Sequence, residues 1–328
     1  MIADLRSPLA THIQAFIAHK RALGKGLHKQ ELVFRRLDRY LVEHGVASPY
    51  GITPAILDGF LCSRPRLSPR SYNELLGSLR RLFDWLVWQE VFAASPLSTP
   101  SRRVPPRRRP FLFNSDQAKQ LFDAAGRLPS YSRSQNRGEI YRMIFLLLYG
   151  LGLRVGEVSR LHRDDVDLDR GLLLICQTKF GKSRWVPFGP NLTREITRFL
   201  QRRDERLDNI PPDFPIFSFA ADCHRPIRPN NISQTFHNLL PSLDLIVPVG
   251  TAPPHLHCLR HSFAVNTLLR WYRSGLDPAA RLLDLATFLG HVSPSSTAVY
   301  LTITAELLEC ANERFARFAS PVIKELLS

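Results

Sequence analysis

A short segment rich in arginine and proline divides the chain and constrains its fold more than any other feature. Residues 101–115 read SRRVPPRRRPFLFNS, with prolines at positions 105, 106 and 110. Proline has no amide hydrogen to donate and favours extended backbone, so this stretch is expected to connect folded parts. A chain of 328 residues is long enough for about two domains. We therefore predict an interdomain linker at residues 101–115.

Positive charge exceeds negative charge in every part of the chain, and the linker holds a third of the excess. The formal net charge is +15 and the isoelectric point is about 10.2. Such an excess favours a polyanionic partner, nucleic acid first and an anionic membrane surface second. No acidic residue balances the linker arginines, which are Arg102, Arg103, Arg107, Arg108 and Arg109. We expect them to contact a DNA backbone, and the alternative is a solvated hinge.

Cysteine usage and hydropathy argue against the secreted and membrane-bound classes of protein. The five cysteines are scattered and never form a CxxC pair, so neither a disulfide scaffold nor a zinc site of the usual spacing is expected. The longest apolar stretch, residues 143–153, is interrupted by glycines and falls short of the ~20 residues that span a bilayer. The N-terminus does not have the basic and apolar segments of a signal peptide. We expect a cytoplasmic protein with no membrane partner.

Residues 1–100 have the apolar periodicity of helices. Helical spacing runs over residues 8–22, 30–44 and 71–92, and a further helix is expected to begin at Pro54. The pattern predicts a helical DNA-binding domain, although a helical bundle of another function would look the same. The aromatic side chains near its end are expected in the core: Phe83, Trp85 and Trp88.

Residues 116–303 mix helical and strand patterns. Residues 166–178 and 184–188 alternate or run apolar around two turns, which predicts a small β-meander. Helical spacing surrounds the meander, over residues 116–126, 137–149, 154–161, 191–206, 229–240, 257–273, 279–290 and 304–318. The expected fold class is mainly α with a small β-meander, in which a helical N-terminal domain is joined to a mixed α/β domain and a helical segment follows at 304–328.

Two polar groups in the first half of this second domain suit a phosphate ligand. In GLGLRVGE, residues 150–157, glycines let the chain turn sharply and present Arg154 at the start of a helix. The predicted hairpin tip TKFGKSR, residues 178–184, carries three cations. Either group alone is more often an ordinary surface feature than a site.

Two further groups lie in the second half of the domain. PHLHCLRHSF, residues 254–263, opens a predicted helix and places His257 and Arg260 on one face. His257 and His261 also have HxxxH spacing, but the glutamate of a HExxH zinc site is absent, so we expect no metal. The last group is LGH, which ends at His291 and is followed by Tyr300 after eight intervening residues.

The order of these groups resembles the tyrosine recombinase family, to which the lambda-type phage integrases belong. The specific signatures are GLRVGE, HCLRH with SFA following, and LGH-x8-Tyr, and the resemblance runs from about residue 115 to 303. It implies a catalytic domain at 116–303 and a core-binding, DNA-binding domain at 1–100. The implied catalytic residues are Arg154, Lys179, His257, Arg260, His291 and Tyr300, with Glu157 in support.

The resemblance also implies a role for each of these side chains. Arg154 and Arg260 clamp the phosphate, and guanidinium forks suit the charge that develops on its oxygens. Tyr300 is the nucleophile, since a phenol is activated by an adjacent base or by cations. Lys179 is the implied acid that protonates the 5′-oxygen leaving group, and His257 is the implied acid/base partner of the tyrosine. His291 is the implied hydrogen-bond donor to the phosphate.

The hairpin departs from the family pattern. It reads Thr-Lys-Phe-Gly-Lys where the family has Gly-Lys-Gly-x-Lys. Alignment to Arg-x-Val-Pro, which starts at Arg184, selects Lys179 as the general acid, and Lys182 stays an open alternative.

The implied activity is site-specific DNA recombination by transesterification, through a 3′-phosphotyrosyl intermediate and a Holliday junction. The phosphotyrosyl link conserves the bond energy, so the reaction is expected to use no cofactor, neither ATP nor a metal. The implied partner is double-stranded DNA with paired recognition arms. Four copies of the chain would bind two duplexes as a homo-tetramer, and the free protein would be a monomer or weak oligomer. Residues 304–328 would then dock on a neighbouring protomer, although packing within one protomer would give the same apolar pattern. The alternatives are a type IB-like topoisomerase and a non-catalytic DNA-binding protein of the same fold.

Overall fold

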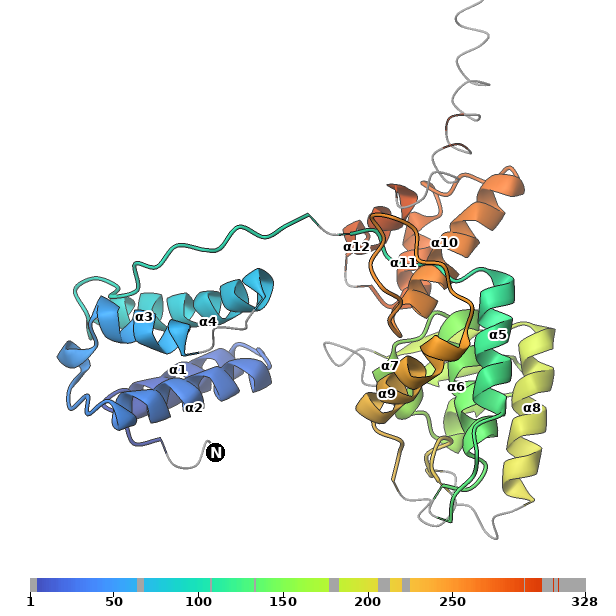
Figure 1. Cartoon of the computed structure of the whole chain (residues 1–328), viewed down its shortest axis with the longest axis horizontal. Helices are drawn as coiled ribbons and strands as arrows, with labels where there is room; N and C mark the ends of the chain where they lie inside the picture. The colour runs from blue at the N-terminus through green and yellow to red at the C-terminus, as the bar shows by residue number, and fades with distance from the viewer. Residues whose placement is uncertain are drawn as a thin grey trace, which may run out of the picture. The chain divides into compact units, whose positions relative to one another are not determined.

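The chain folds into two compact units, residues 1–107 and 108–328, each described by itself below (Figure 1). The computed structural model describes residues 5–63, 68–106, 108–132, 134–176, 183–205, 213–219, 225–291, 293–302, 309 and 312. The boundary between the units falls inside the segment 101–115 that we predicted as the linker. The predicted helix at 304–318, and the segment 304–328 around it, lie outside the described residues except for 309 and 312.

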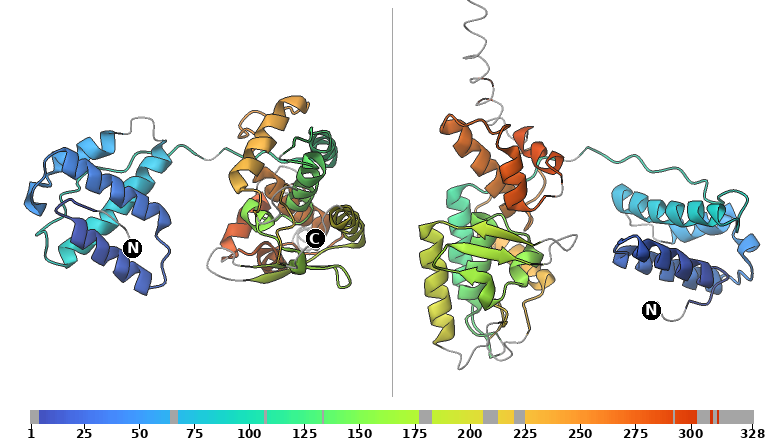
Figure 2. Two further views of the ribbon diagram at one scale, coloured as in Figure 1. Left: turned by 90° about the horizontal axis from the view of Figure 1, so that it is seen from below. Right: turned by 180° about the vertical axis from the view of Figure 1, so that it is seen from behind.

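The first unit is built from four helices, as the apolar periodicity predicts. They are α1 (Ala10–Ala22), α2 (His28–Glu43), α3 (Pro54–Cys62) and α4 (Pro69–Trp88), with a short 3-10 turn at Pro49–Gly51. Proline begins both α3 and α4, and the hydroxyls of Thr53 and Ser68 cap their first amides. Figures 1 and 2 show α3 and α4 lying across α1 and α2.

The core of this unit lies between the two pairs of helices, and one aromatic prediction for it is wrong. Phe83 is fully buried and Trp85 packs partly buried against the core. Trp88, however, is 70% exposed. It follows the buried Leu86 by two residues, and two residues turn a helix by about 200°, to the outer face.

The second unit joins helices to one small sheet, and its three antiparallel strands confirm the predicted meander. The strands are β1 (Val166–Asp167), β2 (Leu172–Ile175) and β3 (Arg184–Pro187), in the order β1-β2-β3. Leu173 pairs with Val166 on one side and with Val186 on the other.

The helices of the second unit cover this sheet and form the core. They are α5 (Ser115–Gly126), α6 (Arg137–Gly150), α7 (Val155–Ser159), α8 (Pro190–Asp204), α9 (Pro229–Leu239), α10 (Cys258–Arg273), α11 (Leu282–Leu289) and α12 (Ser295–Ala298), with 3-10 turns at Arg163–Asp165, Leu240–Ser242 and Val299–Thr302, the last labelled η4. The right-hand view of Figure 2 shows α10 to α12 at one end of the unit, and the strands and α8 toward the other end. The helices α7 and α11 are shorter than predicted, because a turn at Arg160 ends α7 and turn residues up to position 281 precede α11, which ends at Gly290.

Both ends of the predicted linker pack onto a folded unit. Arg102 pairs through its backbone N–H and carbonyl with the side chain of Asn73 in the first unit, both at 2.8 Å. Phe111 and Phe113 are buried in the core of the second unit, and the backbone of Arg109 bonds beside Thr251. The arginines at 102, 103, 108 and 109 are exposed.

None of the helices in the described part of the chain is long and apolar enough to cross a membrane. The described cysteines Cys62, Cys176 and Cys258 are free thiols.

Candidate active site

The C-terminal end of α11 presents consecutive backbone carbonyls to three arginines. The last carbonyls of a helix have no partner within it and carry partial negative charge, which favours cations at this end. The carbonyl of Phe288 accepts from Arg184 Nε at 2.8 Å. The carbonyl of Leu289 accepts from Arg154 Nη1 at 3.3 Å and from Arg260 Nη2 at 2.7 Å. The carbonyl of Gly290 accepts from Arg154 Nη2 at 2.9 Å.

Gly290 makes this arrangement sterically possible. It ends α11 with a φ of 67°, in the left-handed region that glycine adopts without strain. A Cβ at this position would lie 2.8 Å from Nη1 of Arg184. The glycine of LGH therefore turns the chain toward His291 and lets a guanidinium pack against the turn.

Glu157 is the buried carboxylate that joins two of the arginines. One oxygen accepts from Arg154 Nη1 at 2.7 Å and the other accepts from the backbone N–H of Arg154 at 2.9 Å. Arg184 donates Nη1 to one oxygen and Nη2 to the other, both at 3.0 Å. Two carboxylate oxygens thus accept four hydrogen bonds, and the parallel pair from Arg184 fixes the plane of the group.

The charge of Glu157 is held by these partners. Burial alone would raise the carboxyl pKa, but the hydrogen bonds and charge of Arg184, together with those of Arg154, lower the pKa of Glu157 to about 2. The carboxylate is therefore ionised at neutral pH and keeps both guanidinium groups in place.

Arg260 lies deeper than the other arginines, with 1% of its surface exposed. Its Nη1 donates to the carbonyl of Gly152 at 2.6 Å, and no residue in the described part of the chain accepts a hydrogen bond from its Nε. Gly152 has a φ of 59°, and a Cβ there would meet Phe263 Cδ1 at 2.5 Å. Burial, followed by the charge of Arg154, lowers the pKa of Arg260 to about 10, so the side chain stays protonated at neutral pH.

Tyr300 lies in η4, next to this cluster, and is 4% exposed. Its hydroxyl is 2.9 Å from Nδ1 of His261. The ring of His291 stacks near that of Tyr300, with centroids 6.4 Å apart, while Nδ1 of His291 bonds the hydroxyl of Thr297 at 2.6 Å. Burial raises the pKa of the Tyr300 phenol, and the charges of Arg260 and Arg154 oppose that rise.

The imidazoles around Tyr300 are neutral at neutral pH. Burial, followed by the charge of Arg260, lowers the pKa of His291 to about 4. Burial, followed by the charges of His255 and Arg260, lowers the pKa of His261 to about 4. His257 directly precedes α10 and is exposed, but the protein packed around its ring, followed by the charge of His261, lowers its pKa in the same direction.

The cluster as a whole is a site for an anion. Its three guanidinium groups are opposed by one carboxylate, so positive charge is in excess. A phosphodiester brought to the buried Nε of Arg260 would supply the missing acceptor and offset that charge. The phenol of Tyr300 then lies beside the bound group, with neutral imidazoles around it.

The structure brings together six of the residues selected from sequence, which are Arg154, Glu157, His257, Arg260, His291 and Tyr300. Lys179, Lys182 and Arg107 lie outside the described residues. The other linker arginines are exposed and do not belong to the cluster: Arg102, Arg103, Arg108 and Arg109. No group of three or more His, Cys, Asp or Glu side chains suited to a metal ion occurs among the residues with a described placement.

Two members of the cluster were not selected from sequence. Arg184 served only to align the hairpin, and a single arginine in a strand gives no sign of a partner 27 residues earlier. His261 was weighed only as a metal ligand. Its position four residues after His257 places it on the same helix face, and that spacing was the available signal.

Comparison with known proteins gives one consistent result. The model of the phage integrase family matches residues 112–306. A Sinorhizobium fredii protein that carries the name integrase/recombinase y4rB is 32% identical over 310 residues, 93% of this chain and 96% of its own. Tyrosine recombinase XerA of Thermococcus kodakarensis is 32% identical over 248 residues, 75% of this chain and 76% of its own.

A solved structure shares the fold. A lambda integrase tetramer bound to a Holliday junction matches with a TM-score of 0.61 at 18% identity, covering 91% of this chain and 78% of the integrase chain. At this level of identity the match concerns the fold.

Proposed function

This chain belongs to the phage integrase family, the tyrosine recombinases, and we propose that it cuts and rejoins DNA at specific sites through Tyr300. The observation that carries the proposal is the buried Nε of Arg260, which has no acceptor among the described residues and lies in the same cluster as the Tyr300 phenol. A buried donor without an acceptor is costly, and a phosphate oxygen would satisfy it.

The reaction follows from the groups in the cluster. The Tyr300 oxygen attacks the phosphorus of a phosphodiester, and the bond from phosphorus to the 5′ oxygen breaks. Arg154 and Arg260 stabilise the charge that develops on the non-bridging oxygens, and His291 donates a hydrogen bond to the phosphate. The products are a 3′-phosphotyrosyl link and a strand that ends in a 5′-hydroxyl.

The leaving 5′ oxygen needs a proton, and we propose that a lysine of the hairpin donates this proton. Lys179 is the first choice as general acid and Lys182 is the second. Arg184 starts β3, directly after this hairpin, and its three bonds to Glu157 and Phe288 tie the strand to the phosphate cluster.

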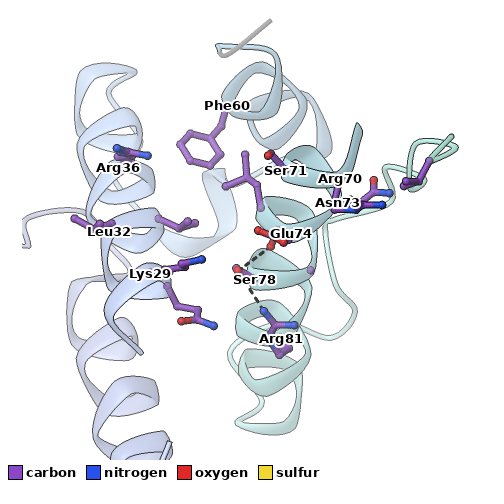
Figure 3. A pocket seen from close by; sticks show the side chains of 15 residues that line it. Lys29, Leu32, Arg36, Phe60, Arg70, Ser71, Asn73, Glu74, Ser78 and Arg81 are labelled. Atoms are coloured by element: carbon purple, nitrogen blue, oxygen red, sulfur yellow. Dashed lines mark hydrogen bonds between the residues drawn. The ribbon is translucent and has the colours of Figure 1, made fainter. Parts of the chain in front are cut away.

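The first unit offers a surface for the DNA partner. A groove of about 710 Å³ runs between α2 and α4. Figure 3 shows Lys29 and Arg36 on one of these helices, and Arg70, Asn73 and Arg81 on the other. These basic side chains are exposed and outnumber the acidic ones in the groove, so the surface suits a phosphate backbone.

The linker continues that surface. Arg102, the first linker arginine, stacks over the ring of Tyr72 at 3.6 Å and bonds Asn73, which lines the groove. We assign DNA backbone contacts to Arg102, Arg103, Arg107, Arg108 and Arg109. A solvated hinge is the alternative.

The stoichiometry of strand exchange sets the proposed assembly. Each protomer supplies one nucleophile, Tyr300, and exchange between two duplexes through a Holliday junction breaks four strands. Four protomers on two duplexes therefore complete the reaction, with each duplex binding a pair through its recognition arms. The protein would act where the cell keeps its DNA, in the cytoplasm.

The C-terminal segment, residues 304–328, is the proposed contact between protomers. An apolar groove of about 620 Å³ is lined by Phe263, Trp271 and Phe288. Leu301, just before this segment begins, packs against the same buried cluster as these rings. We propose that the apolar residues of this segment occupy the groove, either within one chain or between two. Deleting residues 319–328 is expected to weaken assembly on DNA, as measured by sedimentation, and unchanged assembly would refute the contact between protomers.

The experiment that tests the function needs no known target. The protein is incubated with end-labelled fragments of genomic DNA, denatured, and examined for DNA that stays attached. We expect an adduct that Tyr300→Phe abolishes while DNA binding persists. The matched control is Tyr149→Phe, since Tyr149 is a partly buried tyrosine of the same unit that bonds Asn266. No adduct with binding intact would favour the non-catalytic alternative.

The DNA recovered from the adduct separates the remaining alternatives. A recombinase is expected to yield fragments that share one sequence and to exchange strands between two plasmids that carry it. A type IB-like topoisomerase would relax supercoiled plasmids that do not have such a sequence.

A further inference from the structure

Two neighbouring side chains of α10 reach the Tyr300 hydroxyl: Arg260, which donates a hydrogen bond, and His261. Its Nδ1 lies 2.9 Å from the phenolic oxygen, and the two rings are 5.5 Å apart between centroids. His261 is on the second turn of α10, directly after the phosphate-binding Arg260. A hydrogen bond of this length joins a proton donor to an acceptor directly.

We propose that His261, and not His257, holds the hydroxyl of Tyr300 and accepts its proton as the phosphotyrosyl bond forms. The inference rests on the proposed function, because it concerns the base for that reaction.

The surroundings of His261 keep its ring in the form that accepts a proton. The charged and titratable groups that face it are His255 before α10, His257 at its start, Arg260 within it, and Tyr300 from η4. No carboxylate contacts the ring among the described residues. A neutral imidazole with its hydrogen on Nε2 leaves the Nδ1 lone pair directed at the phenol.

The other two imidazoles are engaged differently. His291 Nδ1 bonds Thr297, and its ring stacks on Tyr300 without bonding the hydroxyl. His257 stands perpendicular to His261 at 4.6 Å, and no hydrogen bond joins it to Tyr300 in the described part of the chain. His257 is exposed and directly precedes α10.

The proton transfer balances with the bond changes. The bond from Tyr300 Oη to phosphorus forms, and the phenolic proton moves to Nδ1 of His261. The bond from phosphorus to the 5′ oxygen breaks, and that oxygen takes a proton from the hairpin acid. Religation reverses each step, so His261 returns the proton to Tyr300.

This placement couples the base to the presence of DNA. The charge of Arg260 is one of the causes that make His261 a weak base in the free protein. A phosphodiester bound to Arg260 offsets that charge and stabilises the imidazolium that forms. The nucleophile is thereby activated when a phosphate occupies the site.

The test uses His261→Gln, with His237→Gln as the matched control. His237 is exposed on α9, bonds a backbone carbonyl, and lies outside the cluster. The substrate is a nicked synthetic duplex that carries the site recovered by covalent capture. Equal DNA affinity and equal thermal midpoints for wild type and variant establish that the fold is kept.

We expect His261→Gln to form the adduct about 10²–10⁴-fold more slowly than wild type at neutral pH. Its rate should rise about tenfold per pH unit between pH 7 and 9, because the ionised phenol needs no base, whereas the wild-type rate should stay nearly flat. The control should match wild type throughout.

A second substrate separates the two sides of the reaction. With sulfur in place of the bridging 5′ oxygen, the leaving group needs no acid, so a defect in the hairpin lysine is relieved. The His261→Gln defect should persist on this substrate.

Three outcomes would overturn the proposal. The first is a rate of adduct formation by His261→Gln within threefold of wild type. The second is a His261→Gln rate equal to wild type on the sulfur substrate. The third is a reduction in the His261→Gln rate that is the same at every pH. Absence of any adduct from wild type would instead refute the proposed function.

Discussion

Arg154 and Arg260 donate hydrogen bonds to the same backbone oxygen, the carbonyl of Leu289, at 3.3 and 2.7 Å. Two positively charged side chains that are 106 positions apart in sequence therefore meet at the negative end of one helix. The helix end offsets part of their repulsion before substrate arrives. The two guanidinium groups are thus held together in the free protein, so a phosphate that binds them as we propose does not have to organise them.

Replacing Arg260 with lysine should impair the chemical step far more than DNA binding. Lysine keeps a charge but has no fork to span the two carbonyls and the phosphate, so we expect adduct formation to fall about 10²–10³-fold. Single-turnover cleavage of the recovered site measures the effect. Arg198→Lys, on the exposed face of α8, is the control. A rate within a few-fold of wild type would refute the assignment of Arg260 to the clamp.

The sequence predicted several helices closely because their apolar residues recur on one face. Residues 137–149 and 229–240 became α6 and α9 with ends that differ by one residue. Trp88 was placed wrongly, since hydrophobicity alone does not tell which face of the last turn meets the core.

The site was only partly predictable for a different reason. Arg154 and Tyr300 stand in motifs that have a fixed order, so a resemblance identifies them. The bond from His261 to Tyr300 and the pair formed by Glu157 and Arg184 depend on the tertiary packing of separate elements. No local pattern encodes that packing, and it became visible only in the folded chain.

The ion pairs of Glu157 should make the free energy of unfolding fall at acidic pH. The folded-state pKa of about 2 lies below the value of 4.5 for the free group, so this stabilisation is present above pH 4.5 and is lost as pH falls toward 2. Linkage puts it on the order of 3 kcal/mol. The gap in unfolding free energy between wild type and Glu157→Gln should therefore shrink between pH 5 and 2. Denaturant melts over that range measure it, and a constant gap would contradict the prediction.

Gly152→Ala should destabilise the second unit. The position requires a φ of 59°, and the new Cβ would lie 2.5 Å from Phe263 Cδ1. Strain of this kind costs about 1–3 kcal/mol, and it should also displace the carbonyl that holds Arg260. Gly150→Ala, two residues earlier at the end of α6, is the control because no atom lies within 4 Å of its Cβ. Thermal melts should show a lower midpoint for Gly152→Ala alone.

Arg36→Ala and Arg81→Ala should each weaken DNA binding by the first unit. These side chains lie on opposite walls of the groove between α2 and α4, so loss of either removes about one phosphate contact. The slope of log K against log salt should fall by up to ~0.9 for each. The control is Arg35→Ala, an exposed arginine of α2 that does not line the groove. Equal effects of all three changes would show that only net charge matters.

The linker arginines allow the same distinction between a contact and a general charge effect. Replacing Arg107, Arg108 and Arg109 with glutamine removes three charges, and if they contact phosphates the salt slope should fall by up to ~0.9 per contact. The charge-matched control replaces three exposed arginines of α8, which are Arg194, Arg198 and Arg202. Fluorescence anisotropy over a salt series gives both slopes. A DNA-binding linker lowers the slope in the first variant only, because condensed counterions are released by local contacts and not by distant charge. Equal slopes in the two variants would leave the segment as a solvated hinge.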